Sequence, residues 1–195
     1  MYQWQDQMDV YLTAEGVNWK PYIQDWKTFA GYGPAERDYT PVGIINHHTA
    51  SGAWYPKEKL TTKCNLYIDP DGVVWIMSAG YQFDSGDGDR LVLQAIEHGE
   101  VPPQPQDTST NGLRILGNQW FIDIEVGHPG DGSPIPAVQR ESLIKTNVAL
   151  LRMRGWSPFV NLIDHKWWTT RKIDVNWSWN GEIDKMTDIQ NDTAP

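Results

Sequence analysis

The sequence predicts an α/β domain in which a mixed central β-sheet is flanked by α-helices. Two observations predict this class: apolar runs of strand length, rich in β-branched residues, recur along the chain, and segments with apolar residues at helical spacing separate them. The 195 residues and 39% apolar content suffice for one well-packed core. We therefore expect a single domain, with residues 1–40 as an N-terminal helix and wrap, 41–185 as the main body, and 186–195 as a tail or linker.

The first half of the chain predicts one helix and three strands. Residues 1–40 begin with a weakly periodic polar segment, which predicts a short helix, and continue as a wrap rich in Gly, Pro and aromatic residues. The β-branched run at 42–48, "VGIINHH", predicts a buried strand. Residues 65–78, "NLYIDPDGVVWIMS", predict a hairpin, because Pro70 presets the bend and Gly72 tolerates a positive φ.

The second half predicts two helices and two further strands. Apolar residues at helical spacing predict a helix over 89–98, and the Pro-, Thr- and Asn-rich stretch at 101–118 predicts a long surface loop. Residues 119–126, "QWFIDIEV", predict a strand. The segment 137–154 has one apolar face and is followed by a glycine, which predicts a helix that ends there. Residues 159–165, "FVNLIDH", predict a last strand.

Composition argues against several classes of function. The formal net charge is −9 and no cluster of Lys and Arg is present, so we expect no nucleic-acid partner. No run approaches the roughly 18 apolar residues of a membrane helix, and the start, "MYQWQDQMDV", resembles no signal peptide. We therefore expect no membrane insertion. The single Cys64 excludes an internal disulfide and is compatible with synthesis in a reducing cytoplasm.

Two histidines and a carboxylate stand out as candidate metal ligands. His47 and His165 each end a strand-like apolar run, and Asp174 follows the second histidine by nine residues. Zinc suits imidazole nitrogens and a carboxylate oxygen, and a catalytic zinc site has three protein ligands and one open position. Spacing alone leaves two alternatives open: the His47–His48 pair is incidental, or it is a hydrogen-bonded polar pair without a metal. Mn²⁺ and Fe²⁺ accept similar ligands.

Four motifs in order resemble those of a known enzyme family. The segments are "GIINHHTASG", "NLYIDPDGVVW", "FIDIEV" and "DHKWWTTRKID". Together they resemble the zinc-dependent N-acetylmuramoyl-L-alanine amidases of type 2, a family that includes bacteriophage endolysins, muropeptide-recycling amidases and the peptidoglycan recognition proteins. The resemblance covers residues 41–176 and is greatest to endolysins that attack actinobacterial walls; residues 1–40 also resemble their lead-in. It implies the family's α/β fold and a catalytic domain over 41–185.

The resemblance also implies the roles of five residues. His47, His165 and Asp174 match the ligands of one Zn²⁺ ion. Glu125 matches the carboxylate that handles the proton of zinc-activated water, and Lys172 matches a lysine that stabilises the tetrahedral oxyanion. The implied reaction hydrolyses the amide between N-acetylmuramic acid and L-alanine. Asp164 is a rival third ligand, although its adjacency to His165 makes joint ligation awkward.

Substrate contacts are expected from four other residues. His48, beside the first ligand, has a supporting role by hydrogen bonding or packing. Asp84 opens a "DSG" segment where the family often has His-Ala-Gly, so peptide specificity stays open. His128 and Trp167, the latter paired with Trp168, are candidates to line the groove.

One family position is filled by a different residue type in this chain. Cys64 stands where several phage amidases have a catalytic tyrosine, so that role is unfilled or shifted to Tyr67, and Cys64 itself is expected to be a small buried hydrophobe.

Two alternatives to a wall-lysing enzyme are a non-catalytic peptidoglycan-binding module and a cytosolic amidase that recycles soluble muropeptides. For the endolysin reading, the expected partner is bacterial peptidoglycan. We expect a monomer that resides in the host cytoplasm before it reaches the wall. The polar C-terminal segment suggests a wall-binding domain downstream.

Overall fold

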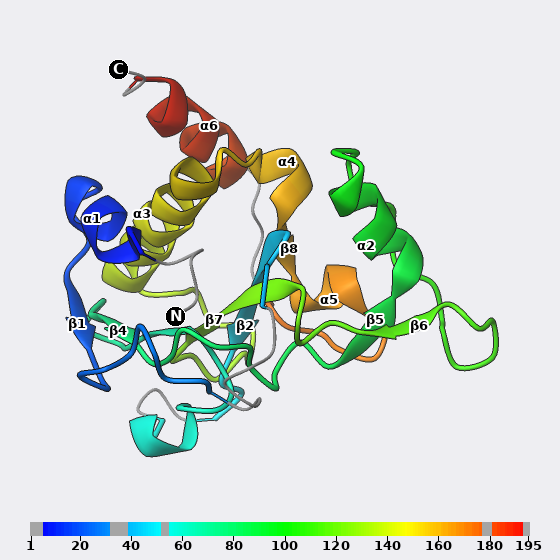
Figure 1. The fold of residues 1–195 in the computed structure, drawn as a ribbon, viewed down its shortest axis with the longest axis horizontal. Helices are drawn as coiled ribbons and strands as arrows, with labels where there is room; N and C mark the ends of the chain where they lie inside the picture. The colour runs from blue at the N-terminus through cyan, green and yellow to red at the C-terminus, as the bar shows by residue number, and fades with distance from the viewer. Residues whose placement is uncertain (1–5, 32–38, 52–54, 177–180, 193–195) are drawn as a thin grey trace.

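A six-stranded mixed sheet forms the centre of the molecule (Figure 1). The computed structural model describes residues 6–31, 39–51, 55–176 and 181–192. The strand order is β1–β4–β3–β7–β2–β8, and all neighbours are parallel except the antiparallel pair β3–β4. The strands are β1 (Trp19–Pro21), β2 (Gly43–His48), β3 (Leu66–Ile68), β4 (Val74–Ile76), β7 (Phe121–Val126) and β8 (Leu162–Asp164). The predicted α/β class with a mixed sheet is confirmed.

The two central strands, β2 and β7, are buried along their whole lengths. They are parallel and in register, so that Ile45 lies opposite Asp123, and His47 lies opposite Glu125. Because side chains alternate between the faces of a strand, His47, Asp123 and Glu125 share one face of the sheet. Polar groups on a fully buried strand need partners, and here they mark the face that carries the site.

The opposite face of the sheet packs on the larger apolar core. Ile44, Ile122 and Ile124 from the central strands join Leu143 and Val148 of helix α3 in this cluster. Helix α3 (Ala137–Arg154) crosses this layer beside α1 (Met8–Ala14) and α6 (Glu182–Asp192) (Figure 1).

The site-bearing face has its own smaller core. Ile45, Phe121 and Ile163 of the sheet pack there with Trp168 and with helix α2 (Arg90–Glu97). The ring of Phe121 meets that of Trp168 edge-on at 5.0 Å between centroids. Helices therefore cover both faces of the sheet, as predicted.

Local signals explain where the two long predicted helices begin and end. Asp89 caps α2 by accepting a hydrogen bond from the Leu91 amide. The observed helix lies within the predicted range 89–98 and is one residue shorter at each end. Helix α3 follows Pro136 and ends at Gly155, whose φ of 65° is the left-handed conformation that glycine adopts without cost. Both predictions are confirmed.

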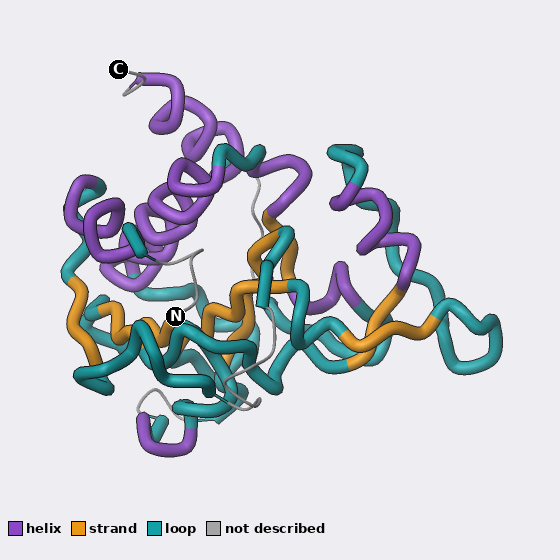
Figure 2. The backbone as a smooth tube through the Cα atoms, in the orientation of Figure 1, coloured by secondary structure: helices purple, strands orange, loops and turns teal. Residues whose placement is uncertain are grey.

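A hairpin turn, a separate two-stranded ribbon and a short 3₁₀ turn belong to the rest of the fold (Figure 2). The hairpin β3–β4 turns at Gly72 (φ 75°), and Asp69 accepts hydrogen bonds from the Asp71 and Val73 amides. A short antiparallel ribbon pairs β5 (Asp87–Asp89) with β6 (Arg114–Leu116), so the end of the loop predicted at 101–118 is a strand. A single 3₁₀ turn, η2, spans Lys57–Lys59.

The strand predicted at 159–165 is only partly correct. The structure instead has helix α4 (Pro158–Asn161), strand β8 and helix α5 (His165–Trp168). Ser157 caps α4 by accepting a hydrogen bond from the Phe159 amide, and Pro158 occupies the first helical position, so this cap overrides the β-branched composition that follows.

The segment expected as a tail over 186–195 is helical as far as Asp192, and residues 193–195 lie outside the described residues. Helix α6 runs from Glu182 to Asp192, and Met186 is fully buried in the larger core. The wrap expected over 1–40 contains α1 and β1, while the parts at 1–5 and 32–38 lie outside the described residues. Within the described ranges, no helix is both long and apolar enough to cross a membrane.

Candidate metal centre

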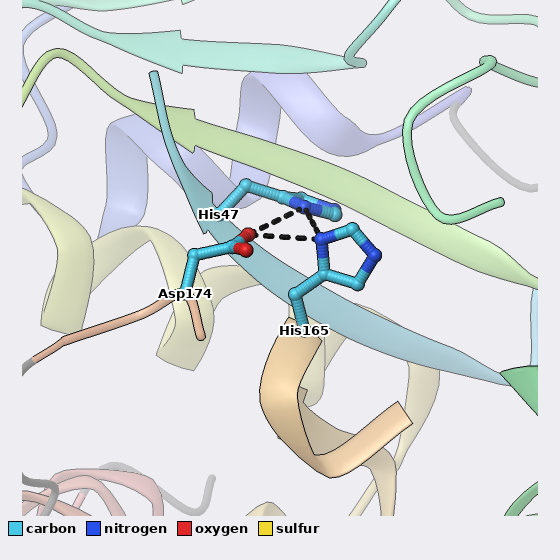
Figure 3. Close-up of side chains that lie close together, drawn as sticks. All are labelled: His47, His165 and Asp174. Atoms are coloured by element: carbon cyan, nitrogen blue, oxygen red, sulfur yellow. Dashed lines mark hydrogen bonds and ion pairs between the residues drawn. The ribbon is translucent and has the colours of Figure 1, made fainter. Parts of the chain in front are cut away.

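Three predicted ligands converge at one end of the sheet. The Nδ1 atoms of His47 and His165 lie 2.9 Å apart, and Asp174 Oδ2 lies 3.4 Å from the first and 2.9 Å from the second (Figure 3). Their backbones come from β2, from the first residue of α5 and from the segment that follows α5. All three residues are buried. The three side chains therefore present their polar atoms to one common point.

Parallel strand pairing brings the two histidines together although they are 118 positions apart. β8 is parallel to β2, with Asn46 opposite Asp164, so His165 leaves β8 beside the end of β2 where His47 lies. The Lys166 amide donates to the Asp174 carbonyl at 2.6 Å, which holds the ligand-bearing segment against the start of α5. The carboxyl ends of parallel strands meet at one edge, which is where open α/β sheets bind ligands.

These three groups also contact one another, and the contacts shift their pKa values. Burial lowers the pKa of His47, but its hydrogen bonds to Asp123 and Asp174 outweigh burial and raise that pKa well above its usual value. Burial and the charge of His47 lower the pKa of His165 to about 4. Burial acts to raise the pKa of Asp174, yet the two histidine hydrogen bonds dominate and lower it.

The donor set fits a divalent metal. Among the described residues, His47, His165 and Asp174 each offer one ligand atom, and the three lie within 4.8 Å of one another. Two imidazole nitrogens and one carboxylate oxygen are ligands that zinc accepts, with a fourth position left for water or substrate. These residues can therefore hold a metal ion.

Asp164, the rival ligand, lies elsewhere. It belongs to β8 next to Ile163, which faces the smaller core, so alternation directs Asp164 to the opposite face. Its Oδ2 lies 3.8 Å from Lys166 Nζ. It is not part of the metal-binding group.

Glu125 forms a carboxyl pair with Asp84 next to these ligands. Burial raises the pKa of Glu125 well above its usual value, and the negative charge of Asp84 raises it further. Burial alone acts to raise the pKa of Asp84, but the hydrogen bond with Glu125 and the charge of His47 lower it. The environment thus favours the protonated form of Glu125 and the ionised form of Asp84. Both can also approach a cation together with His47.

A pocket of about 160 Å³ collects seven of the nine predicted site residues. They are His47, His48, Asp84, Glu125, His165, Lys172 and Asp174. Lys63 and Tyr55 are among the other residues that line it. His48 is buried, and a side chain at Gly130 would overlap its ring, which explains why this turn has a glycine there. The predicted supporting position of His48 is thus built by close packing.

A second pocket of about 400 Å³ continues from the first. The two share Lys63, Asp84, His165 and Lys172. Arg171 also lines it, donating from its guanidinium to the Asp87 carbonyl, while Phe83 and Leu116 supply exposed apolar surface. An extended, partly cationic groove therefore leads away from the metal ligands.

Two predicted contact residues line neither pocket. His128 is buried, and its Nδ1 accepts a hydrogen bond from the Gly130 amide at 3.1 Å, so it shapes the turn behind His48. Trp167 is 39% exposed, whereas its neighbour Trp168 is fully buried in the smaller core.

Cys64 and Tyr67 are both buried near Glu125. Cys64 is fully enclosed, as predicted, and burial raises its pKa. Burial also raises the pKa of Tyr67 to about 12. On β3, Tyr67 lies opposite Glu125 of β7.

Asp123, Ser85 and Arg171 are among the site residues that were not predicted. Asp123 accepts a hydrogen bond from His47 at 3.0 Å and one from the Ser85 hydroxyl. The sequence did hold a signal for Asp123, because residues two apart on a strand share a face and Glu125 was already expected in the site. Ser85 and Arg171 lie in loops, which have no regular spacing of side chains from which their direction could be predicted.

The fold is shared with solved amidase structures, although the sequence matches no family model and no curated protein. N-acetylmuramoyl-L-alanine amidase LysC from Clostridium intestinale URNW aligns over 87% of this chain and 97% of its own, with a TM-score of 0.54 and 16% identity. The Ph2119 endolysin from Thermus scotoductus MAT2119 bacteriophage Ph2119 covers 86% and 98%, with a TM-score of 0.52 and 17% identity. The PlyG catalytic domain aligns over 91% of this chain and 98% of its own, with a TM-score of 0.51 and 14% identity.

Proposed function

We propose that this chain, which has the fold of those amidases, hydrolyses the amide bond between N-acetylmuramic acid and L-alanine in bacterial peptidoglycan, as an endolysin does. The observation that carries the proposal is the convergence of His47, His165 and Asp174 in one pocket with the Glu125 carboxyl group. A metal-ligand triad beside a buried acid, at the mouth of a longer groove, is the arrangement that metal-assisted amide hydrolysis requires.

The cofactor in this proposal is one Zn²⁺ ion held by His47 Nδ1, His165 Nδ1 and an Asp174 oxygen. When bound, zinc supplies Lewis acidity, which polarises the scissile carbonyl and makes water acidic enough to attack at neutral pH. Metal binding requires neutral imidazoles and an ionised carboxylate, so we expect zinc affinity to fall as the pH is lowered.

Glu125 carries the proton in this mechanism. It lies opposite His47 across the β2–β7 pair, so its carboxyl group faces the same space as the ligand atoms. In its ionised form, Glu125 accepts a proton from the attacking water and then delivers it to the leaving nitrogen of L-alanine. Asp84 lines the same pocket, and its negative charge helps to keep the pKa of Glu125 raised.

Lys172 lines both pockets. Its ammonium group provides positive charge for the oxygen of the tetrahedral intermediate, an interaction that is stronger in the transition state than with the bound substrate.

The larger pocket accommodates the stem peptide in this proposal. Lys63 and Arg171 offer cationic contacts for its carboxylates, and Phe83 and Leu116 offer apolar surface.

We further propose that the chain acts as a monomer on the wall after release from the host cytoplasm. A net charge of −9 gives little attraction to an anionic envelope, so we assign wall attachment to a separate binding domain of the lysin.

Product analysis on purified peptidoglycan tests the proposal. New L-alanine amino termini that disappear with a chelator and return with Zn²⁺ are expected, without new reducing sugar ends. Reducing ends would mean glycan cleavage and would overturn the mechanism. Zinc binding without any product would favour a non-catalytic binding module. Cleavage of soluble muropeptides but not of intact sacculi would favour a recycling amidase.

A further inference from the structure

Asp123 contacts the metal centre from behind. It is completely buried, and its Oδ1 atom lies 3.0 Å from His47 Nε2. The other ring nitrogen of His47, Nδ1, faces His165 and Asp174. The two nitrogens of one imidazole therefore serve two different partners, one on each side of the ring.

The position of Asp123 is itself fixed by further contacts. The Ser85 hydroxyl donates to the same Oδ1 atom, and Asn65 Oδ1 accepts from the Asp123 amide at 2.9 Å. The Asn65 side chain in turn donates to the carbonyls of Ser78 and Gly80. Asp123 thus belongs to a buried network that links β7, β3 and the loop after β4, rather than to a mobile surface.

Asp123 is not a ligand of the same group. The metal-binding sets found among the described residues contain His47, His165, Asp174, Asp84 and Glu125, but not Asp123. An imidazole that donates through Nε2–H to a carboxylate has its lone pair on Nδ1, which is the atom that faces the other two ligands.

We propose that Asp123 is a positioning residue that keeps His47 in the tautomer whose Nδ1 binds the metal, and that Ser85 orients Asp123 for this task. The inference rests on the zinc site of the proposed function. Carboxylate partners of metal-bound histidines fix the orientation of the ring and raise its basicity, and their loss costs about 10- to 100-fold in metal affinity. Ser85 follows Asp84, so one loop supports both His47 and Glu125.

Zinc affinity, measured by competition with a chelator of known affinity, tests the inference independently of amidase activity. We expect Asp123→Ala to weaken zinc binding by about 10- to 100-fold. Asp123→Asn retains an acceptor oxygen for His47, so it should restore most of the affinity lost in the alanine variant. Ser85→Ala should weaken zinc binding less than Asp123→Ala, because Asp123 keeps its contact with His47.

Asp89 provides a matched control. It is also fully buried and also accepts two hydrogen bonds, from the amides of Leu91 and Gln106, but it lines neither pocket. Asp89→Ala and Asp89→Asn should lower stability while leaving zinc affinity unchanged. If Asp123→Ala fails to fold, the comparison of Ser85→Ala with Asp89→Asn still separates positioning from general stability, since only Ser85→Ala should weaken zinc binding.

A spectroscopic readout reports on the tautomer itself. In the zinc-loaded protein, ¹⁵N NMR of the imidazoles should show a proton on Nε2 of His47 that exchanges slowly with water in the parent and rapidly in Asp123→Ala. Wild-type zinc affinity in both Asp123 variants, or a proton on Nδ1 of His47, would overturn the inference alone. A parent protein that binds no zinc would instead overturn the proposed function together with it.

Discussion

Glu125 combines burial with a negatively charged neighbour, and both effects favour its protonated form. Burial raises its pKa first, and the Asp84 carboxylate adds to this effect. A carboxyl group whose pKa is moved toward neutral exchanges protons more effectively at physiological pH than an exposed glutamate does. The pair therefore gives Glu125 a property that the strand sequence alone does not reveal.

Replacing Glu125 tests this assignment. Glu125→Gln removes the proton carrier but preserves size, so we expect kcat to fall by about 10²- to 10⁴-fold while zinc affinity stays within a few-fold of the parent. Because only the ionised group accepts a proton, kcat of the parent should rise as pH increases through the raised pKa of Glu125, which lies above 4.5. This limb should be absent in Glu125→Gln when rates are measured across pH.

The exposed Glu141 of α3 provides the control for this experiment. It pairs with Lys145 at 2.8 Å, remote from the pockets, so Glu141→Gln should retain the parental rate and pH profile. A Glu125→Gln protein with parental kcat would exclude Glu125 as the proton carrier.

At the residue scale, the sequence predicted the metal-facing groups better than their support. His47, His165 and Asp174 were expected together from motif resemblance, and the structure brings them together. Asp123 was passed over because its role depends on strand register: it matters only once β2 lies beside β7. His128 and Trp167 were expected to line the groove, but neither residue lines the two pockets described above.

The elements that the sequence predicted correctly are those with strong local signals. Helix α3 has a glycine stop and the β3–β4 hairpin has an Asp-Pro-Asp-Gly turn. Helix α6 was missed because Glu182–Asp192 is polar, and its stability comes from packing on α3 and α4 rather than from its own composition. The spacing of Met186 and Ile189 was the available signal.

Met186 provides a test of α6 as part of the domain. Met186→Ala removes a fully buried side chain from the larger core, so we expect the free energy of unfolding to fall by about 2–5 kcal/mol. The neighbouring exposed Lys185→Ala should change it by no more than about 0.5 kcal/mol. Urea denaturation followed by circular dichroism measures both. Equal stability of the two variants would restore the tail interpretation for this segment.

The whole molecule should be stabilised by its metal, because an ion that binds only the folded state shifts the unfolding equilibrium. At free zinc about 100 times its Kd, the gain is about 2.7 kcal/mol, which corresponds to a rise in Tm of about 5–10 °C for a chain of this size. Differential scanning calorimetry with Zn²⁺ and with a chelator measures the difference. The Tm of His165→Ala should not depend on zinc. If the Tm of the parent protein changes neither with Zn²⁺ nor with the chelator, the zinc site is contradicted.

Whole-molecule topology was the part of the fold least accessible to sequence. The sequence predicted an α/β class and a mixed sheet, but not which strands are neighbours. The order β3–β7–β2–β8 places strands side by side that are far apart along the chain, and this order alone turns separate motifs into one site. Such pairing is non-local, so no window of sequence contains it.

The distance along the chain between the metal donors has a consequence for biosynthesis. His47 is made 118 residues before His165, and Asp174 follows nine residues later. A ribosome-bound chain that has exposed only the first histidine has no chelating site, because its partners have not yet been translated. A complete donor set therefore exists only late in synthesis, once β8 lies beside β2. Fragments that end before Asp174 lack one of the three donor groups, so the amide hydrolysis proposed above requires translation to have passed this residue.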